Sequence, residues 1–341
     1  MDKIEKPFII PIFISHKGCP HRCSFCNQTA ITGAEPDIPS SEAIRLMVSE
    51  FLSYKKEQRK TVQISFYGGN FLGLKENDIV SLLQEAARFT ENGSVDSIRF
   101  STRPDTIDNR RLDLIRGFPV STIELGVQSM DDRVLAMARR GHTSADTEKA
   151  AALLKERDYS VGMQMMVGLP GDDEAIAMAA AHKIADLSPD FVRIYPTVVL
   201  ADSLLARWYD SGKYAPMPLD ECVTLVKRLY LFFRERKIPV IRMGLQASED
   251  LLKEGSILAG PYHPAFGHLV HSEIFLDRAS SVIESQNAPN ETISISVHPR
   301  NISKMRGIRN RNIEILKNRF HISSIKVVSD VSLGEDELNI F

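Results

Sequence analysis

Apolar and polar residues alternate along the first two thirds of the chain in blocks that switch between strand and helix spacing. Short, largely apolar blocks predict strands, and longer blocks with apolar residues three or four apart predict helices. Six strands are expected, at residues 7–14, 61–67, 96–104, 121–129, 159–171 and 191–196. Helices are expected after them, at residues 40–57, 75–89, 109–118, 131–140, 144–158 and 173–187.

This alternation predicts a parallel sheet covered by helices, because parallel neighbours need a crossover between them. An α/β partial (β/α)6 TIM-like barrel is favoured over a doubly wound sheet, and the pattern alone fits both. In either fold, chemistry gathers at the carboxyl ends of the strands. Several landmarks fall there, namely the cysteine-rich loop, Gly68 with Gly69, residues 101–105, Gln128 and residues 168–171.

The pattern changes after about residue 245. Helices are expected at residues 271–285 and 312–320, and strands at 292–299 and 322–330. We therefore expect two parts, a core barrel over residues 1–245 and a C-terminal α/β extension over 246–341 that is a possible substrate-binding unit.

Composition and charge exclude several classes of protein. A chain of 341 residues that is 43% hydrophobic can bury a sizeable core. No apolar run approaches the ~20 residues that span a bilayer, and the apolar run near the start is interrupted by Pro11. We expect a cytoplasmic protein with no membrane partner. A net charge of −2 provides no general attraction for nucleic acid, so RNA binding would need a local basic patch.

Three of the four cysteines lie within eight residues, as Cys19, Cys23 and Cys26 in a C-x3-C-x2-C spacing. Three thiolates in one tight loop can hold three irons of a 4Fe–4S cluster, because soft sulfur ligands suit iron–sulfur chemistry. No fourth cysteine lies nearby, so the fourth iron would accept an outside ligand. Cys222 falls in a helical stretch and is expected to pack as a small hydrophobic residue.

A structural zinc site is the main alternative, with His16 or His21 as a fourth ligand. The spacing differs from the paired C-x2-C knuckles of zinc sites, and a disulfide is disfavoured in a reducing compartment. These arguments favour the cluster.

The cysteine spacing, with Phe25 before the last cysteine, resembles the signature of radical S-adenosylmethionine enzymes. The segment YGGNF at 67–71 looks like their Gly-Gly motif, which receives the methionine amino group. Residues 124–245 are similar to the radical domain of the elongator catalytic subunit, a tRNA wobble-uridine modifier, in the segments IELGVQS, ARRGHT, MMVGLPGD and RIYPTVVL. Oxygen-independent coproporphyrinogen III oxidases share fewer of these motifs.

The resemblance implies an enzyme that binds a 4Fe–4S cluster at the three cysteines. It implies reductive cleavage of S-adenosylmethionine to a 5′-deoxyadenosyl radical, which abstracts hydrogen from a substrate. An electron donor such as a flavodoxin or ferredoxin is expected as a partner. Eight residues are expected to contact S-adenosylmethionine, namely Gly68, Gly69, Asn70, Ser101, Arg103, Gln128, Arg140 and Gln164.

The match is imperfect at two of these positions, and a third position, Arg140, matches but has an alternative role. Ser101 stands where many relatives have a glutamate, and Gln164 stands where the porphyrinogen oxidases have an aspartate. Arg140 is also placed as a cation that follows a helix end, which is a purely structural role.

The substrate is expected to depend on the C-terminal part, where no acyl-CoA signature is found. Residues 260–273 contain His263, His268 and His271, and a polar substrate-facing loop is favoured there over a metal site. Residues 297–312 carry a basic run that suits phosphate or RNA backbone, made up of Lys304, Arg306, Arg309 and Arg311. An RNA base is the preferred substrate, and a phosphorylated or carboxylated small molecule is the alternative.

Two further functions stay open at this point. A tetrapyrrole enzyme would give a porphyrin-dependent absorbance band or product. A non-catalytic carrier, whose cluster serves heme or electron transfer, would bind the cluster but make no 5′-deoxyadenosine.

Overall fold

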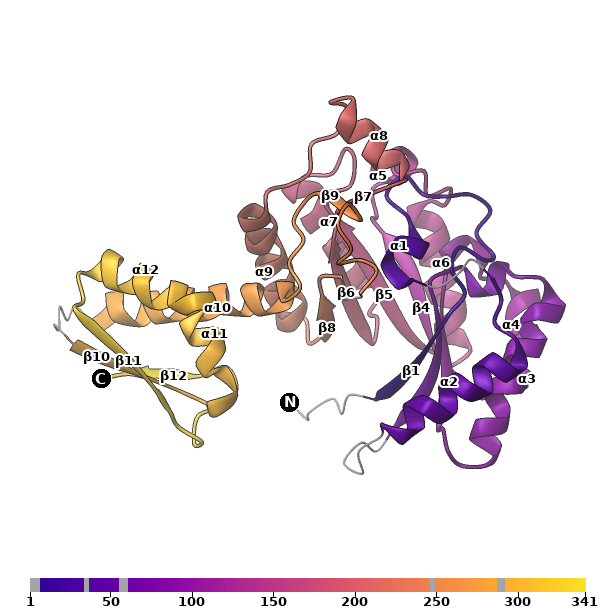
Figure 1. Cartoon of the computed structure of the whole chain (residues 1–341), viewed down its shortest axis with the longest axis horizontal. Coiled ribbons are helices and arrows are strands. Elements are labelled where there is room, and N and C mark those ends of the chain that lie inside the picture. The colour runs from indigo at the N-terminus through magenta and orange to yellow at the C-terminus, as the bar shows by residue number, and fades with distance from the viewer. Residues whose placement is uncertain (1–6, 34–36, 55–60, 246–248, 287–291) are drawn as a thin grey trace.

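The computed structural model describes residues 7–33, 37–54, 61–245, 249–286 and 292–341. Its main feature is a seven-stranded parallel sheet with neighbours in the order β1-β2-β3-β4-β5-β6-β8. The sheet curls into a half-barrel (Figure 1), which confirms the predicted partial TIM-like barrel. Its strands are β1 (Phe8–Phe13), β2 (Val62–Tyr67), β3 (Ser97–Thr102), β4 (Val120–Gln128), β5 (Ser160–Val167), β6 (Phe191–Pro196) and β8 (Val240–Met243).

The six predicted strands and the six helices between them are all present, although several boundaries move by a few residues. The first predicted helix extended to residue 57, and its last three residues lie outside the described part of the chain. The main helices are α2 (Ser41–Ser53), α3 (Glu76–Glu91), α4 (Asn109–Ile115), α5 (Asp132–Met137), α6 (Ser144–Glu156), α7 (Glu174–Asp186) and α9 (Leu219–Glu235). Strand β8 was not predicted; it follows α9 and extends the sheet to a seventh strand.

Helix starts are determined locally by side chains that accept hydrogen bonds from the first turn. Ser40 caps α2, and Asp173 caps α7 in the same way. Thr143 and Asp146 form a reciprocal capping box at the start of α6. Each cap satisfies backbone N–H groups that have no partner within the helix, so the short loops lead directly into helices.

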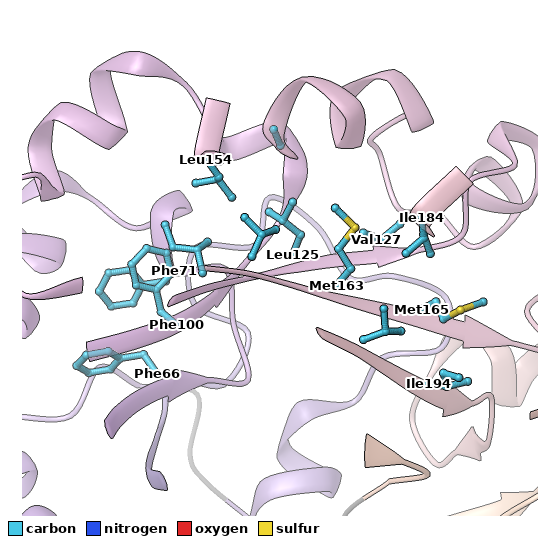
Figure 2. Close-up of a cluster of buried hydrophobic side chains, with 14 of the residues drawn as sticks. Phe66, Phe71, Phe100, Leu125, Val127, Leu154, Met163, Met165, Ile184 and Ile194 are labelled. Atoms are coloured by element: carbon cyan, nitrogen blue, oxygen red, sulfur yellow. The ribbon is translucent and has the colours of Figure 1, made fainter. Parts of the chain in front are cut away.

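The main core lies between the sheet and its helices, as Figure 2 shows. Alternate strand residues such as Phe66, Phe100 and Met163 are at most 1% exposed, and they pack toward Leu154 of α6 and Ile184 of α7. The residues between them point to the other, concave face of the half-barrel, because side chains alternate along a strand. We expected largely apolar strands. The face toward the helices is apolar, whereas the concave face is apolar on β1 but carries polar residues such as Arg99, Glu124 and Arg193 on other strands.

The C-terminal part forms a smaller sheet in the order β11-β10-β12. Helix α10 (Phe266–Gln286) joins it to the half-barrel, and Figure 1 shows this unit beside the main sheet. Val270 of α10 lies in the main core, whereas Ala279 lies in the second core. A domain boundary at residue 245 stays a prediction, and α10 contributes to both cores. The remaining elements of the unit are β10 (Thr292–Val297), β11 (Ser324–Ser329), β12 (Leu338–Ile340), α11 (Ile302–Arg306) and α12 (Arg311–Phe320).

Two short helices and a two-stranded ribbon flank the carboxyl ends of the main strands; they are α1 (Gln28–Thr32), α8 (Leu204–Asp210), β7 (Val199–Leu200) and β9 (Ile257–Ala259). Within the described residues, every helix is too short or too polar to span a bilayer.

Candidate cofactor site

The cysteine loop follows β1 and lies over the carboxyl end of the sheet. Backbone hydrogen bonds hold it in place from both sides. Asn70 N donates to Lys17 O at 2.8 Å, and Ser24 N donates to Ala138 O at 2.9 Å. The loop is therefore attached to the segment after β2 and to the end of α5.

Asn70 is fully buried and joins the loop to β3. Its Nδ2 donates to Gly18 O at 2.9 Å. Its Oδ1 accepts hydrogen bonds from Thr102 Oγ1 at 2.8 Å, Arg103 N at 2.9 Å and Thr106 Oγ1 at 3.0 Å. With all these contacts made within the protein, the Asn70 side chain positions the cysteine loop and does not line the cavity beside it.

Gly68 and Gly69 are required by the backbone itself. Gly68 has φ of 84°, a left-handed conformation that side chains disfavour. A Cβ on Gly69 would lie 2.5 Å from Ile14 O and 2.6 Å from Lys17 O. The absence of a side chain at Gly69 thus makes room for the cysteine loop, in addition to any approach to a ligand.

Replacing Gly69 with alanine should displace the cysteine loop, because both clashing atoms are backbone carbonyl oxygens. We expect Gly69→Ala to lower the free energy of unfolding by about 1–3 kcal/mol and to reduce iron retention after reconstitution. Denaturant unfolding and iron analysis measure the two effects. Gly117→Ala is the matched control, since a Cβ there would meet nothing within 4 Å. Wild-type stability and iron content in Gly69→Ala would contradict the packing argument.

A cavity of about 710 Å³ opens between the cysteine loop and the concave face of the sheet. All three clustered cysteines line it. Seven of the eight residues predicted to contact the cofactor line it too, namely Gly68, Gly69, Ser101, Arg103, Gln128, Arg140 and Gln164. A second hollow, of about 950 Å³, lies around residues 168–174 and 213–225 and contains none of these residues.

The three thiols lie close enough to influence one another. Burial, followed by the neighbouring Cys23, raises the pKa of Cys26 to about 12 and also raises the pKa of Cys19. Arg140 Nη1 donates to Cys23 Sγ at 3.3 Å, and Gln28 Nε2 donates to Cys26 Sγ at 3.5 Å. Donors aimed at sulfur suit thiolates bound to a cluster, whose negative charge they offset.

The zinc alternative has no support in this geometry. Among the residues that the structure describes, no three His, Cys, Asp or Glu side chains converge on a point suited to one ion. His16 Nε2 accepts from Gln28 N at 2.9 Å, and His21 Nε2 donates to Arg139 O at 2.8 Å. Both candidate fourth ligands therefore already have hydrogen-bond partners within the protein.

Each of the two arginines beside the thiols has one buried nitrogen without a hydrogen-bond partner among the described residues. In Arg140 this nitrogen is Nε, while Nη1 donates to Cys23 Sγ at 3.3 Å and Nη2 donates to Gly126 O at 2.6 Å. Arg103 forms a two-pronged pair with Asp105 at 2.9 and 2.8 Å. Its Nη1 is buried and makes no hydrogen bond to any described residue. That nitrogen is a donor available to an anionic group in the cavity.

The ends of β4 and β5 place two amides in the cavity. Gln128 adopts a left-handed conformation with φ of 68°, which is uncommon outside glycine and recurs at functional sites. Its Oε1 accepts from Gln164 Nε2 at 3.2 Å. Ser101 lines the same cavity from β3.

A second polar cluster on the cavity wall was missed by the sequence reasoning. Glu124 of β4 accepts hydrogen bonds at 3.0 Å from both Tyr67 Oη and Arg193 Nη2. Arg99 Nε pairs with the same carboxylate at 3.3 Å. The signal was present in the strands. Every second residue of SIRFST is polar, and FVRIYP carries Arg193 and Tyr195 two positions apart.

The C-terminal candidates do not join this site. His263, His268 and His271 are absent from the lining of the 710 Å³ cavity, so the expected substrate-facing loop is not found there. In the basic run, Arg311 pairs with Asp220 at 3.3 Å, while Arg306 and Arg309 are exposed. Its role in binding RNA stays a prediction.

Comparison with known proteins decides the family. Residues 13–183, half of the chain, match the model of the radical SAM superfamily, where SAM is S-adenosylmethionine. Residues 189–275 match the model of the radical SAM C-terminal domain. The chain belongs to the radical SAM superfamily. Members of this superfamily are enzymes that bind a 4Fe–4S cluster and S-adenosylmethionine.

Relatives of this chain include proteins named as a tRNA-modifying enzyme and as an elongator subunit. A tRNA uridine(34) acetyltransferase of Dehalococcoides mccartyi is 27% identical over 232 residues, which cover 59% of this chain and 50% of that protein. Elongator complex protein 3 of Saccharomyces cerevisiae is 29% identical over 215 residues, which cover 59% of this chain and 38% of that protein. The matched region thus spans half or less of these two relatives.

A solved structure of the superfamily shares the fold. The archaeal Methanocaldococcus infernus Elp3 with an N-terminal deletion superposes with a TM-score of 0.60 at 18% identity, covering 82% of this chain and 64% of that one. This likeness supports the half-barrel fold and carries no information on substrate.

Proposed function

We propose that Cys19, Cys23 and Cys26 hold a 4Fe–4S cluster and that the adjoining cavity binds S-adenosylmethionine. The main observation behind this proposal is that the three thiols and the predicted cofactor contacts converge on a single cavity. Three thiols from one loop share it with residues at the ends of four successive strands, β2 to β5. When bound, the two groups supply one-electron reduction of a sulfonium and, through it, abstraction of a hydrogen atom.

The residues of the chain would bind and shield these groups. Arg140 and Gln28 donate to the sulfurs and offset thiolate charge. Arg103 Nη1 offers a donor to the carboxylate of S-adenosylmethionine, since guanidinium and carboxylate pair strongly. Phe13, the last residue of β1 before the cysteine loop, lines the cavity and would exclude water from the reacting centre.

The substrate proposed is a base in RNA, with a flavodoxin or ferredoxin as the electron donor. Two observations support RNA over a small molecule. Relatives of this chain carry names that specify a uridine of tRNA. The C-terminal unit also exposes Arg306 and Arg309, whose charge suits a phosphate backbone.

The test uses the full chain, reconstituted anaerobically with iron and sulfide, with S-adenosylmethionine, a reductant and bulk tRNA. We expect tRNA to stimulate formation of 5′-deoxyadenosine, and digestion of the tRNA to release a nucleoside of altered mass. The same mixture without tRNA and the Cys23→Ala variant with tRNA are the controls. Cleavage of S-adenosylmethionine that tRNA neither stimulates nor couples to a new nucleoside would overturn the RNA assignment and leave the radical chemistry intact.

A further inference from the structure

The cavity wall on β4, β6 and β8 carries more positive charge than its own carboxylate balances. Glu124 is the only acidic residue that lines the cavity within the described chain, whereas five arginines do. The whole chain has a net charge of −2, so this concentration of cations is local. Arg103 is paired with Asp105, so four guanidinium groups remain for the one carboxylate of the lining. Such an excess of guanidinium groups facing a cavity favours an anionic occupant. The five are Arg22, Arg103, Arg140, Arg193 and Arg242.

These arginines fall into separate groups. Arg140 donates to Cys23 Sγ at 3.3 Å, and Arg103 pairs with Asp105 at 2.9 and 2.8 Å. Arg193 has other partners, because its Nη2 donates to Tyr67 Oη and to Glu124 Oε1, both at 3.0 Å. Arg193 therefore forms a separate group from the arginine that contacts a candidate cluster ligand.

Arg242 stands directly beside Arg193 across the β6–β8 pair. The two residues are partners in the strand register, so their side chains lie on the same face of the sheet. Both line the cavity. Like charges placed opposite each other destabilise a pair of strands. Glu124 is shared between Arg193 and Arg99, and no described residue forms an ion pair or hydrogen bond with Arg242.

The cavity also reaches both free edges of the half-barrel. β1 and β8 are the two end strands of the sheet, as Figure 1 shows. Phe8, Pro11 and Phe13 line the cavity from β1, and Arg242 lines it from β8. A ligand that enters between these edges meets an apolar wall on one side and two guanidinium groups on the other.

We propose that Arg193 and Arg242 form an anion subsite that takes a phosphate or carboxylate group of the substrate. The subsite would hold the charged end of the molecule against β6 and β8 and present the rest toward the cysteine loop. This inference deepens the proposed function and rests on it, because it assigns the subsite to the substrate of the same cavity.

Titration calorimetry of the full reconstituted chain tests the subsite. S-adenosylmethionine is present to occupy the cofactor end, and no reductant is added. Three probes are compared, uridine 5′-monophosphate, uridine and malonate, so that phosphate and carboxylate are distinguished.

We expect one or both anions to bind and uridine to bind far more weakly. Arg242→Gln should lower the affinity for the anion by about ten-fold or more, as expected for loss of a charged hydrogen bond. Arg242→Lys should recover part of the affinity, because it keeps the charge without the planar fork.

Arg110→Gln is the matched control, because it removes the same charge from a side chain that is 82% exposed and outside the cavity. Failure of both anions to bind the wild-type protein would overturn the subsite. Equal affinity of the wild type and Arg242→Gln for the anions would also overturn the subsite. So would a loss of anion affinity in Arg110→Gln as large as that in Arg242→Gln. Formation of 5′-deoxyadenosine by the wild-type protein is measured separately, so failure of the radical chemistry is distinguishable from failure of the subsite.

Discussion

Replacing Cys23 with alanine is expected to abolish the absorbance of the reconstituted protein at about 400 nm. The variant should also lose most of the iron that the wild type binds, which is about four atoms per chain. Cys23 is the central thiol of the three. It affects the pKa of both Cys19 and Cys26, and its sulfur accepts the hydrogen bond from Arg140. Two remaining thiolates would leave a second iron without a protein ligand, so we expect the cluster to be lost rather than weakened. Absorbance and iron analysis after anaerobic reconstitution measure the effect.

Cys222→Ala is the matched control. Cys222 is fully buried on α9, and it does not line the cavity. The variant should keep its iron and its absorbance, because only core packing changes. Full absorbance in Cys23→Ala, or equal losses in the two variants, would contradict the assignment of the cluster to this loop.

The second large effect is expected on stability, at Glu124. This carboxylate is 4% exposed and is the common partner of Arg99 and Arg193. Glu124→Gln removes the charge and leaves two largely buried guanidinium groups without a counter-charge. Breaking a buried pair in this way costs about 3 kcal/mol, since the desolvation of the remaining charge is no longer offset. Denaturant unfolding of the full chain measures the change in the free energy of unfolding.

The exposed pair between Arg110 and Glu76 provides the comparison. Its side chains are 82% and 50% exposed. Glu76→Gln should therefore change the free energy of unfolding by less than about 1 kcal/mol. Equal effects of the two substitutions would show that the concave face is hydrated enough to solvate its charges. In that case Glu124 would not organise the arginines around it.

The strand–helix alternation predicted most of the half-barrel because helix spacing and caps are local properties of the chain. Strand β8 was not predicted because it is short. It has four residues, Val240–Met243, at the edge of the sheet, and Pro239 directly before it is typical of a turn or an edge strand. Helix α10 begins five residues before its predicted start, at Phe266, which packs in the main core.

The site was predicted in part. The resemblance supplied the residues, and parallel topology explains why seven of eight meet, since neighbouring strands end at one edge. The Asn70 side chain holds the loop, and contact between the Asn70 backbone and the cofactor stays a prediction. Glu124 and Arg193 were missed because their strands were interpreted as largely apolar, and Arg242 was missed because β8 was not predicted. Only the curl of the sheet turns their polar face into a cavity wall.

The central claim is that this cavity cleaves S-adenosylmethionine with a cluster bound by three cysteines. The most direct test is anaerobic reconstitution of the full chain, addition of S-adenosylmethionine and a strong reductant, and detection of 5′-deoxyadenosine by mass spectrometry. The account predicts that the wild-type protein forms this product and that Cys23→Ala does not. Binding of iron and S-adenosylmethionine without any 5′-deoxyadenosine, with or without tRNA, would contradict it.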